Sequence, residues 1–330
     1  MTGQVTIVKP RFLRKGDTVA LVAPASPPFE EGHAEFTYRW LTSLGLKYKV
    51  GKHIFDNYSD LAGTDEARLE DFHEAWRDPE VSAIFPIRGG NGSVRLLPHI
   101  DFDLVRNNPK ILIGYSDITG LLIPIHQKTG LVTFHGPTAG SFFEGAYTHH
   151  YFRKAVMSNK PIGMIVDPPT SEHVWKPQYP PPRMVIAEGR ARGALVGGSL
   201  TLIRQLMGTP WEIETEGKLV FLEDVGEEPH SMDAMICQLL LANKLQKCAG
   251  IIFGESVKCV PGASRRNTLM LNFSLERVLR DRLADLGIPV VYGLRFGHGE
   301  NKFTLPLGVV AVLEAGKGGV KFKIEEAGTV

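Results

Sequence analysis

The chain has 330 residues, enough for about two domains and for a large buried core that needs no disulfide or metal support. Hydrophobic residues make up 43% of it, and 37 Lys and Arg nearly balance 36 Asp and Glu, so no bulk charge attracts nucleic acid or a membrane surface. No apolar run reaches the roughly 18–20 residues of a membrane span, and the N-terminal segment is charged where a signal peptide is apolar, so we expect a cytoplasmic protein.

Three cysteines, an odd number without a CxxC pair, argue against a disulfide framework and against a zinc site. We expect Cys237, Cys248 and Cys259 to be small buried hydrophobic side chains. The histidines also lack metal-binding spacing, since His149 and His150 are adjacent rather than four apart. The sequence therefore predicts neither a metal nor a cofactor.

Short apolar runs alternate with helical segments in the first half of the chain. This alternation is typical of parallel strands joined by crossover helices, and it predicts an α/β domain. Thr64 precedes the second helical segment and two acidic residues follow it, which indicates an N-cap. The expected strands are 18–24, 82–87, 110–114 and 131–134, and the expected helices are 31–44, 64–76 and 118–127.

A proline-rich stretch, residues 161–182, interrupts this alternation. Because proline is excluded from helix interiors and inner strands, we interpret the stretch as an interdomain connection with a loop that includes Trp175. The predicted domains are 1–165 and 190–330, joined by 166–189. In the C-terminal part the expected helices are 197–207, 231–245 with Ser231 as N-cap, and 269–286, and the expected strands are 218–222, 249–253, 289–292, 309–313 and 319–324.

Ser116 stands where a buried strand passes sharply into a helix, in the segment KILIGYSDITG. A serine at such a turn exposes its hydroxyl, and the N–H of Asp117 lies at the positive end of the following helix. These are the features of a nucleophile elbow, although Ile118 stands where the G-x-S-x-G pattern has its second glycine. The alternative is that Ser116 or Asp117 is only a helix N-cap.

The glycine-rich segment RGGNG, residues 88–92, directly follows the expected strand at 82–87. Glycines let backbone N–H groups approach a ligand, so this loop could hold an oxyanion or a phosphate; the alternative is a plain tight loop. It is a poor dinucleotide fingerprint, because Arg95 stands where the third glycine belongs, and no P-loop motif occurs in the sequence.

His298 lies between two glycines in FGHG, which leaves its imidazole accessible. Glu223 ends the apolar strand of KLVFLED, and a carboxylate at a buried strand end can orient an imidazole; the alternative is an ion pair or an N-cap. Together with Ser116, these residues supply the nucleophile, the general base and the orienting carboxylate that acyl transfer needs. Backbone N–H groups near Gly90 and at Asp117 would face the developing oxyanion.

Seven segments between residues 16 and 307 resemble the LD-carboxypeptidases, the murein tetrapeptide carboxypeptidases that are grouped with the microcin C immunity-type peptidases. The segments are GDTVALVAPASP, RGGNGSVRLLPHID, NPKILIGYSDITGLL, GLVTFHGP, GGSLTLIRQLMGTP, LVFLEDVGEEPHSMDAMICQLL and FGHGENKFTLPLG. The resemblance implies an α/β fold, with an N-terminal parallel-sheet domain joined to a smaller β-rich α/β C-terminal domain, often as a homodimer. It also implies a metal-independent serine peptidase with a triad of Ser116, Glu223 and His298 and an oxyanion hole from the N–H groups of Gly90 and Asp117.

Two substrates compete within the family. An LD-carboxypeptidase removes the terminal D-Ala of a cytoplasmic murein tetrapeptide, whereas an immunity-type member cleaves an amide between an aspartyl carboxyl and a nucleotide-like group. Asn91 stands where the family loop commonly has Tyr, which alters the pocket wall and not the backbone donors. Trp175 would stack on a nucleobase or anchor the connection, and Arg88 or Arg295 would bind a substrate carboxylate.

We therefore expect a cytoplasmic serine carboxypeptidase that acts on a small peptide or peptidyl-nucleotide, without a nucleic-acid or membrane partner. A second class remains open, a two-domain binding protein that holds a small ligand between its domains without cleaving it. A fluorophosphonate probe would label Ser116 only in the enzyme. The broken glycine fingerprint disfavours a dinucleotide-dependent enzyme.

Overall fold

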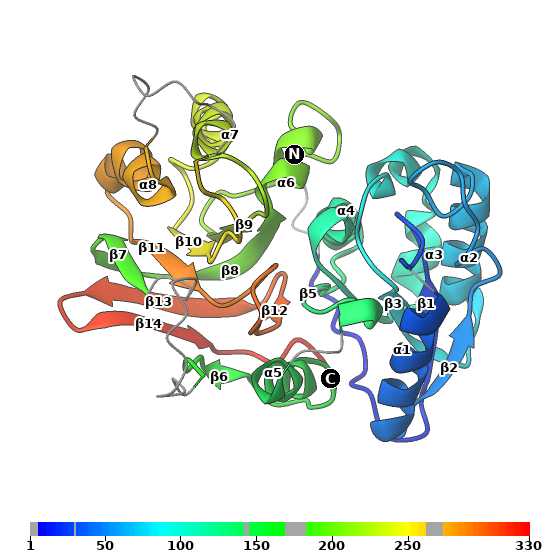
Figure 1. Cartoon of the computed structure of the whole chain (residues 1–330). Coiled ribbons are helices and arrows are strands. Elements are labelled where there is room, and N and C mark those ends of the chain that lie inside the picture. The colour runs from blue at the N-terminus through cyan, green and yellow to red at the C-terminus, as the bar shows by residue number, and fades with distance from the viewer. Residues whose placement is uncertain (1–5, 30, 142–144, 169–182, 262–272) are drawn as a thin grey trace.

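The computed structural model describes residues 6–29, 31–141, 145–168, 183–261 and 273–330 of the chain. Figure 1 shows two lobes, each organised around one sheet. The buried hydrophobic residues nevertheless form one contiguous cluster that includes strands of both sheets. In the described part of the chain, no helix has the length and apolar character needed to cross a bilayer.

The first lobe contains a six-stranded sheet in the order β12-β5-β4-β3-β1-β2, parallel throughout except for β12. Its central strands are short runs of buried aliphatic residues, as helices on both faces of a parallel sheet require. The strands are β1 (Thr18–Val22), β2 (Lys47–Val50), β3 (Val81–Pro86), β4 (Ile111–Gly114), β5 (Phe134–His135) and β12 (Leu305–Pro306). The helices are α1 (Glu31–Ser43), α2 (Asp65–Arg77), η1 (Ser93–His99), α3 (Phe102–Asn107), η2 (Ser116–Ile118), α4 (Thr119–Thr129), η3 (Ala139–Ser141) and α5 (Ala146–Val156).

The second lobe contains an eight-stranded sheet in the order β6-β14-β13-β8-β9-β10-β11-β7. Strands β8 to β11 are parallel, and the strands that flank them are antiparallel. The strands are β6 (Gly163–Met164), β7 (Met184–Ala187), β8 (Gly189–Ser199), β9 (Leu219–Glu223), β10 (Gly250–Gly254), β11 (Val290–Leu294), β13 (Val310–Gly316) and β14 (Gly319–Ile324). The helices are α6 (Leu200–Leu206), α7 (Pro229–Leu241), α8 (Leu275–Leu283) and η4 (Ala284–Leu286).

The chain passes between the lobes more than once. Strand β6 precedes the predicted boundary at residue 165 but pairs with β14 in the second sheet, and β12 returns to the edge of the first sheet. The backbone of Val330 then bonds to both Pro10 and Phe12, at 3.0 and 3.1 Å. The two sheets thus exchange short strands across the division predicted at residues 165 and 190.

The predicted α/β class and most central strands are confirmed, and Thr64 caps α2 by accepting a bond from the N–H of Ala67 at 3.3 Å. Several boundaries were predicted wrongly, among them that of the strand expected at 131–134, which is Phe134–His135 in the structure. Residues 197–199 belong to β8 and not to a helix, because two glycines hid the end of this strand. Helix α7 begins at Pro229 after the N-cap Glu228, so Ser231 is not its cap, and it ends at Leu241. Of the helix predicted at 269–286, residues 269–272 lie outside the described part of the chain, and α8 follows the N-cap Ser274.

Candidate active site

The turn after β4 holds Ser116 in a strained conformation, at the carboxyl ends of the central strands of the first sheet. Its φ is 62°, in the left-handed region that costs a residue with a side chain about 1–3 kcal/mol. The N-cap of η2 is Tyr115 and that of α4 is Ile118, so neither Ser116 nor Asp117 is a helix cap. A Cβ on Gly114 would lie 2.8 Å from Ile118, which explains the glycine. The elbow geometry expected from the sequence is therefore present.

The glycine-rich loop after β3 packs directly on this turn. A Cβ on Gly89 would lie 2.9 Å from the Cβ of Ser116 and 3.2 Å from the backbone N of Asp117. Gly90 has a φ of 111°, and a Cβ there would lie 2.2 Å from the hydroxyl of Ser26. Ser26 also donates its N–H to the carbonyl of Gly89 at 3.3 Å. Glycine at both positions thus lets the loop approach the serine turn.

Two buried charged residues fix the far end of the loop. The carboxylate of Asp117 is 3% exposed and accepts the N–H of Ser93 at 2.8 Å, while the hydroxyl of Ser93 donates to the carbonyl of Asp117 at 2.6 Å. The guanidinium of Arg68 donates to the carbonyls of Gly92 and Pro24, at 3.0 and 2.6 Å. Burial raises the pKa of Asp117, although the bonds from Ser93 act in the opposite direction. These contacts hold the loop against the serine turn.

Glu223 and His298 form a hydrogen-bonded pair at the carboxyl ends of the central strands of the second sheet. Nδ1 of His298 donates to Oε2 of Glu223 at 2.7 Å, and the glutamate side chain is fully buried. Burial alone would raise the pKa of Glu223, but the charge and hydrogen bonds of His298 outweigh it and hold this pKa below its usual value. Gly297 has a φ of 83°, and its missing side chain leaves the space that the carboxylate occupies. The carboxylate is thus ionised and fixes the orientation of the imidazole.

The two lobes bring the serine turn and this pair together. The ring of Tyr115, next to Ser116, meets the ring of His298 edge to face with 4.9 Å between centroids. Behind this contact, the hydroxyl of Thr119 on α4 accepts the N–H of Ser199 on β8 at 3.1 Å. A Cβ on Gly198 would lie 2.4 Å from Thr119, so the glycine allows the close approach of α4 to β8.

Arg88 is better placed than Arg295 to bind a substrate carboxylate. Arg88 donates to the carbonyl of Pro27 at 3.3 Å and stacks over the ring of Phe29 at 3.6 Å. Among the described residues, no carboxylate lies within ion-pair distance of Arg88. A Cβ on Gly90 would lie 3.5 Å from its guanidinium, which places this charge beside the glycine-rich loop.

Arg295 already has carboxylate partners. It donates to Oε1 of Glu255 at 2.6 Å, and its Nε lies 3.5 Å from Asp167. Burial raises the pKa of Glu255 to about 7, although the charge of Arg295 opposes this shift.

Two further residues were candidates for substrate contact, Asn91 and Trp175. The amide of Asn91 donates to Asp60 at 2.9 Å, and Trp175 lies outside the described residues.

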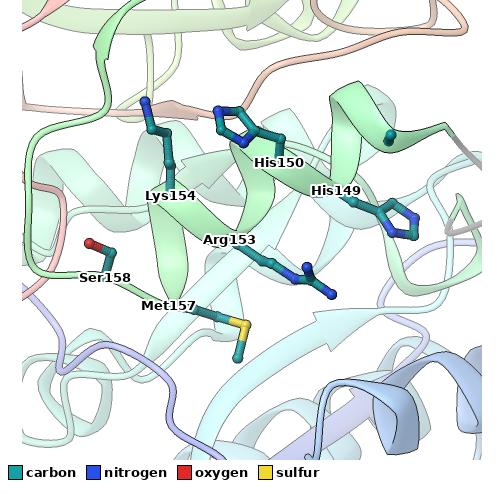
Figure 2. A pocket seen from close by; sticks show the side chains of 7 residues that line it. His149, His150, Arg153, Lys154, Met157 and Ser158 are labelled. Atoms are coloured by element: carbon teal, nitrogen blue, oxygen red, sulfur yellow. The ribbon is translucent and has the colours of Figure 1, made fainter.

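A separate hollow of about 590 Å³ lies along α5, away from the residues above (Figure 2). It contains none of the candidate site residues, and its lining is Ala146, His149, His150, Arg153, Lys154, Met157 and Ser158. Within the described ranges, no three His, Cys, Asp or Glu side chains converge so that they could hold a metal ion.

Three residues of this site were not found by sequence reasoning. Arg68 and Ser26 act on backbone groups of the glycine-rich loop, and no local pattern marks such contacts. His135 lies at the end of β5, with Nε2 4.0 Å from Oε1 of Glu223. Its position at a strand end, before Gly136 in the segment FHGP, is a signal of the same kind that identified Ser116.

Family models match both lobes of this structure. The LD-carboxypeptidase N-terminal domain matches residues 19–136, and the LD-carboxypeptidase C-terminal domain matches residues 192–313. The chain belongs to the LD-carboxypeptidase family. It is therefore an enzyme, a serine-type carboxypeptidase, and the non-catalytic binding protein is set aside.

Individual relatives match nearly the whole chain. A probable murein peptide carboxypeptidase of Bacillus subtilis is 41% identical over 97% of this chain and 95% of its own length. A murein tetrapeptide carboxypeptidase of Pseudomonas aeruginosa is 32% identical over 91% of this chain and 94% of its own. The structure of the microcin C7 self-immunity protein MccF in complex with aspartyl sulfamoyl adenosine is similar with a TM-score of 0.85 and 26% identity, over 98% of this chain and 100% of that one.

Proposed function

We propose that this enzyme releases the terminal D-Ala from a cytoplasmic murein tetrapeptide by hydrolysing the L–D peptide bond, with Ser116, His298 and Glu223 as its catalytic triad. The observation that carries the proposal is the 2.7 Å hydrogen bond between His298 and Glu223, placed beside the strained turn of Ser116. The names of the two murein peptidase relatives support this choice of substrate.

The proposed reaction proceeds through an acyl-enzyme. The Oγ of Ser116 forms a bond to the scissile carbonyl carbon while Nε2 of His298 takes its proton, because Nδ1 is bonded to Glu223. The C–N bond then breaks, and His298 returns the proton to the amine of the leaving D-Ala. A water molecule, deprotonated by the same imidazole, hydrolyses the ester and regenerates the serine.

Two backbone donors support this reaction. The N–H groups of Gly90 and Asp117 come from the loop and the turn that pack on each other, and they would stabilise the oxyanion; removal of one such donor typically costs about 10²–10³ in rate. Arg88 would bind the terminal carboxylate of the peptide, which makes the enzyme a carboxypeptidase.

A second substrate class, the aspartyl-nucleotide amides, is favoured by the fold similarity to MccF in complex with aspartyl sulfamoyl adenosine. Both substrates present an amide carbonyl next to a carboxylate, so the same triad would serve either of them. The choice depends on the pocket wall, where Asn91 replaces the usual Tyr. We also expect a homodimer, which sedimentation would test.

The experiment compares two substrates with two proteins. Wild type and Ser116→Ala are incubated with L-Ala–D-Glu–diaminopimelate–D-Ala and, separately, with an aspartyl-adenylate amide, and the products are identified by mass spectrometry. We expect the wild type to release D-Ala and the variant to bind the tetrapeptide without cleaving it. Hydrolysis by Ser116→Ala at the wild-type rate would refute the mechanism, and cleavage of the aspartyl amide alone would refute the substrate.

A further inference from the structure

His135 is a fully buried histidine that lies between the two lobes. It is 1% exposed, and its backbone is paired with Leu305 of β12. Three aromatic rings surround the imidazole edge to face, with centroids at 5.4 Å for Phe221, 6.1 Å for Phe296 and 6.4 Å for Tyr115. The ring is therefore held in one orientation.

The polar atoms of His135 are aimed at the carboxylate of the proposed triad. Nε2 lies 4.0 Å from Oε1 of Glu223, while the other oxygen of that carboxylate accepts the bond from His298. Among the described residues, neither ring nitrogen of His135 has a hydrogen-bond partner, and neither does Oε1 of Glu223. Buried polar atoms without partners are unfavourable, and an apolar ring would fill this aromatic niche at lower cost. A histidine here needs a reason other than packing.

We propose that His135 is a positioning residue for the catalytic carboxylate: in the substrate complex its Nε2–H donates to Oε1 of Glu223, while Oε2 continues to hold His298. The inference rests on the proposed triad. Hydrogen bonds of catalytic groups are often long without substrate and shorten in the complex, and a closure of about 1 Å completes this one.

The protonation state of His135 suits this role. Burial lowers its pKa to about 4; the charge of Glu223 opposes this shift, and the charges of His298 and Lys302 add to it. The imidazole is neutral near pH 7 and has one N–H to donate. A neutral donor holds the carboxylate in place when His298 becomes charged in the transition state. Because neutral His135 does not protonate Glu223, the carboxylate stays ionised.

Three substitutions separate donor position from packing. His135→Gln places an amide N–H near the position of Nε2, His135→Asn reaches only the position of Nδ1, and His135→Phe fills the niche without a donor. We expect His135→Phe and His135→Asn to lose about 10–100-fold in kcat with KM nearly unchanged, because a bond to a charged group is lost. His135→Gln should recover most of the activity. The matched control is His126→Gln, a second buried histidine whose Nδ1 bonds to the carbonyl of Leu131, and it should keep the wild-type kcat.

The rate of Ser116 labelling by a fluorophosphonate is measured beside turnover, since labelling reports activation of the serine for any substrate. Wild type that is labelled but does not cleave the tetrapeptide would refute the substrate alone, and an unlabelled wild type would refute the triad. The inference about His135 is overturned if the folded Phe variant is labelled and turns over within twofold of wild type. It is also overturned if Gln and Asn lose activity equally, and this pair decides the question where the Phe variant does not fold.

Discussion

Substitution of Gly297 by alanine tests the carboxylate–imidazole pair without altering either partner. The added Cβ would lie 2.2 Å from Oε2 of Glu223, the oxygen that accepts the bond from His298. Ordinary contacts of this kind begin at 3.4 Å, so the loop and the carboxylate have to separate by roughly 1 Å. The 2.7 Å hydrogen bond then lengthens beyond 3.5 Å and is lost.

We expect Gly297→Ala to lower both activity and stability, with the larger effect on activity. A triad whose orienting carboxylate no longer holds the imidazole loses about 10⁴ in kcat in serine proteases, so we expect a decrease of about 10³–10⁴ for Gly297→Ala. The left-handed φ of 83° adds about 1–3 kcal/mol of backbone strain to the folded state. These two effects have different origins and need separate controls.

Gly319→Ala is the matched control, because Gly319 has a φ of 86° but no atom within 4 Å of the position of its Cβ. It has the same backbone strain without the clash, so it should lower the melting temperature less than Gly297→Ala and leave kcat unchanged. Activity is measured as D-Ala release and as fluorophosphonate labelling of Ser116. If Gly297→Ala keeps kcat within tenfold of wild type, the carboxylate does not orient His298 in catalysis.

Three further predictions concern charged residues around the site. Arg68→Met leaves the carbonyls of Gly92 and Pro24 without their buried donor, so it should lower the free energy of unfolding by about 3 kcal/mol in chemical denaturation. The control Arg95→Met removes an exposed partner of the same Asp65 and should change this free energy little. Equal losses in the two variants would contradict this account. Arg88→Lys should raise KM for the tetrapeptide about tenfold with kcat nearly constant, because the bidentate carboxylate contact is lost, and an unchanged KM would assign the carboxylate to another group. Burial raises the pKa of Glu255 to about 7, so as pH rises this carboxyl ionises in the unfolded chain before it ionises in the folded one. The stability of the wild type relative to Glu255→Gln should therefore fall as pH rises from 4.5 to 7. A rise in relative stability over this window would show that Arg295 keeps the carboxylate ionised.

Local patterns were sufficient to predict the elements whose periodicity is strong. Buried aliphatic runs identified β1, β3, β4, β9 and β10, because a strand covered on both faces has no polar alternation to obscure it. Strand β8 was not predicted, and its last three residues were assigned to a helix, because Gly197 and Gly198 carry no strand preference. Both positions are glycine because the backbone closely approaches Phe221 and Thr119. Two-residue strands such as β12 have no local signal, because their partner strand defines them.

The site was predictable where chemistry and strand ends coincide. Glu223 ends a buried strand, and Ser116 and His298 follow one, so the sequence pointed to them as candidates without a view of their contacts. Arg68 was not predictable, because an arginine within α2 reads as a solvent-exposed residue, and only the tertiary structure places its guanidinium on the carbonyl of Gly92. His135 stands at a strand end like Ser116, but its role was not predictable, since the groups around it come from three separate strands and loops.

Strand β12 gives the segment that carries His298 an attachment in each lobe. The segment leaves β11 in the second sheet, is closed at its base by the bond from Phe303 N–H to the carbonyl of Arg295 at 2.9 Å, and joins the edge of the first sheet at Leu305. Neither half is therefore a complete folding unit, since the N-terminal sheet borrows its last strand from the other half. If the chain were cut in the proline-rich stretch, His298 would return to its position only when the two fragments reassembled. Fragment complementation would therefore restore the edge strand of the first sheet and the reaction centre together.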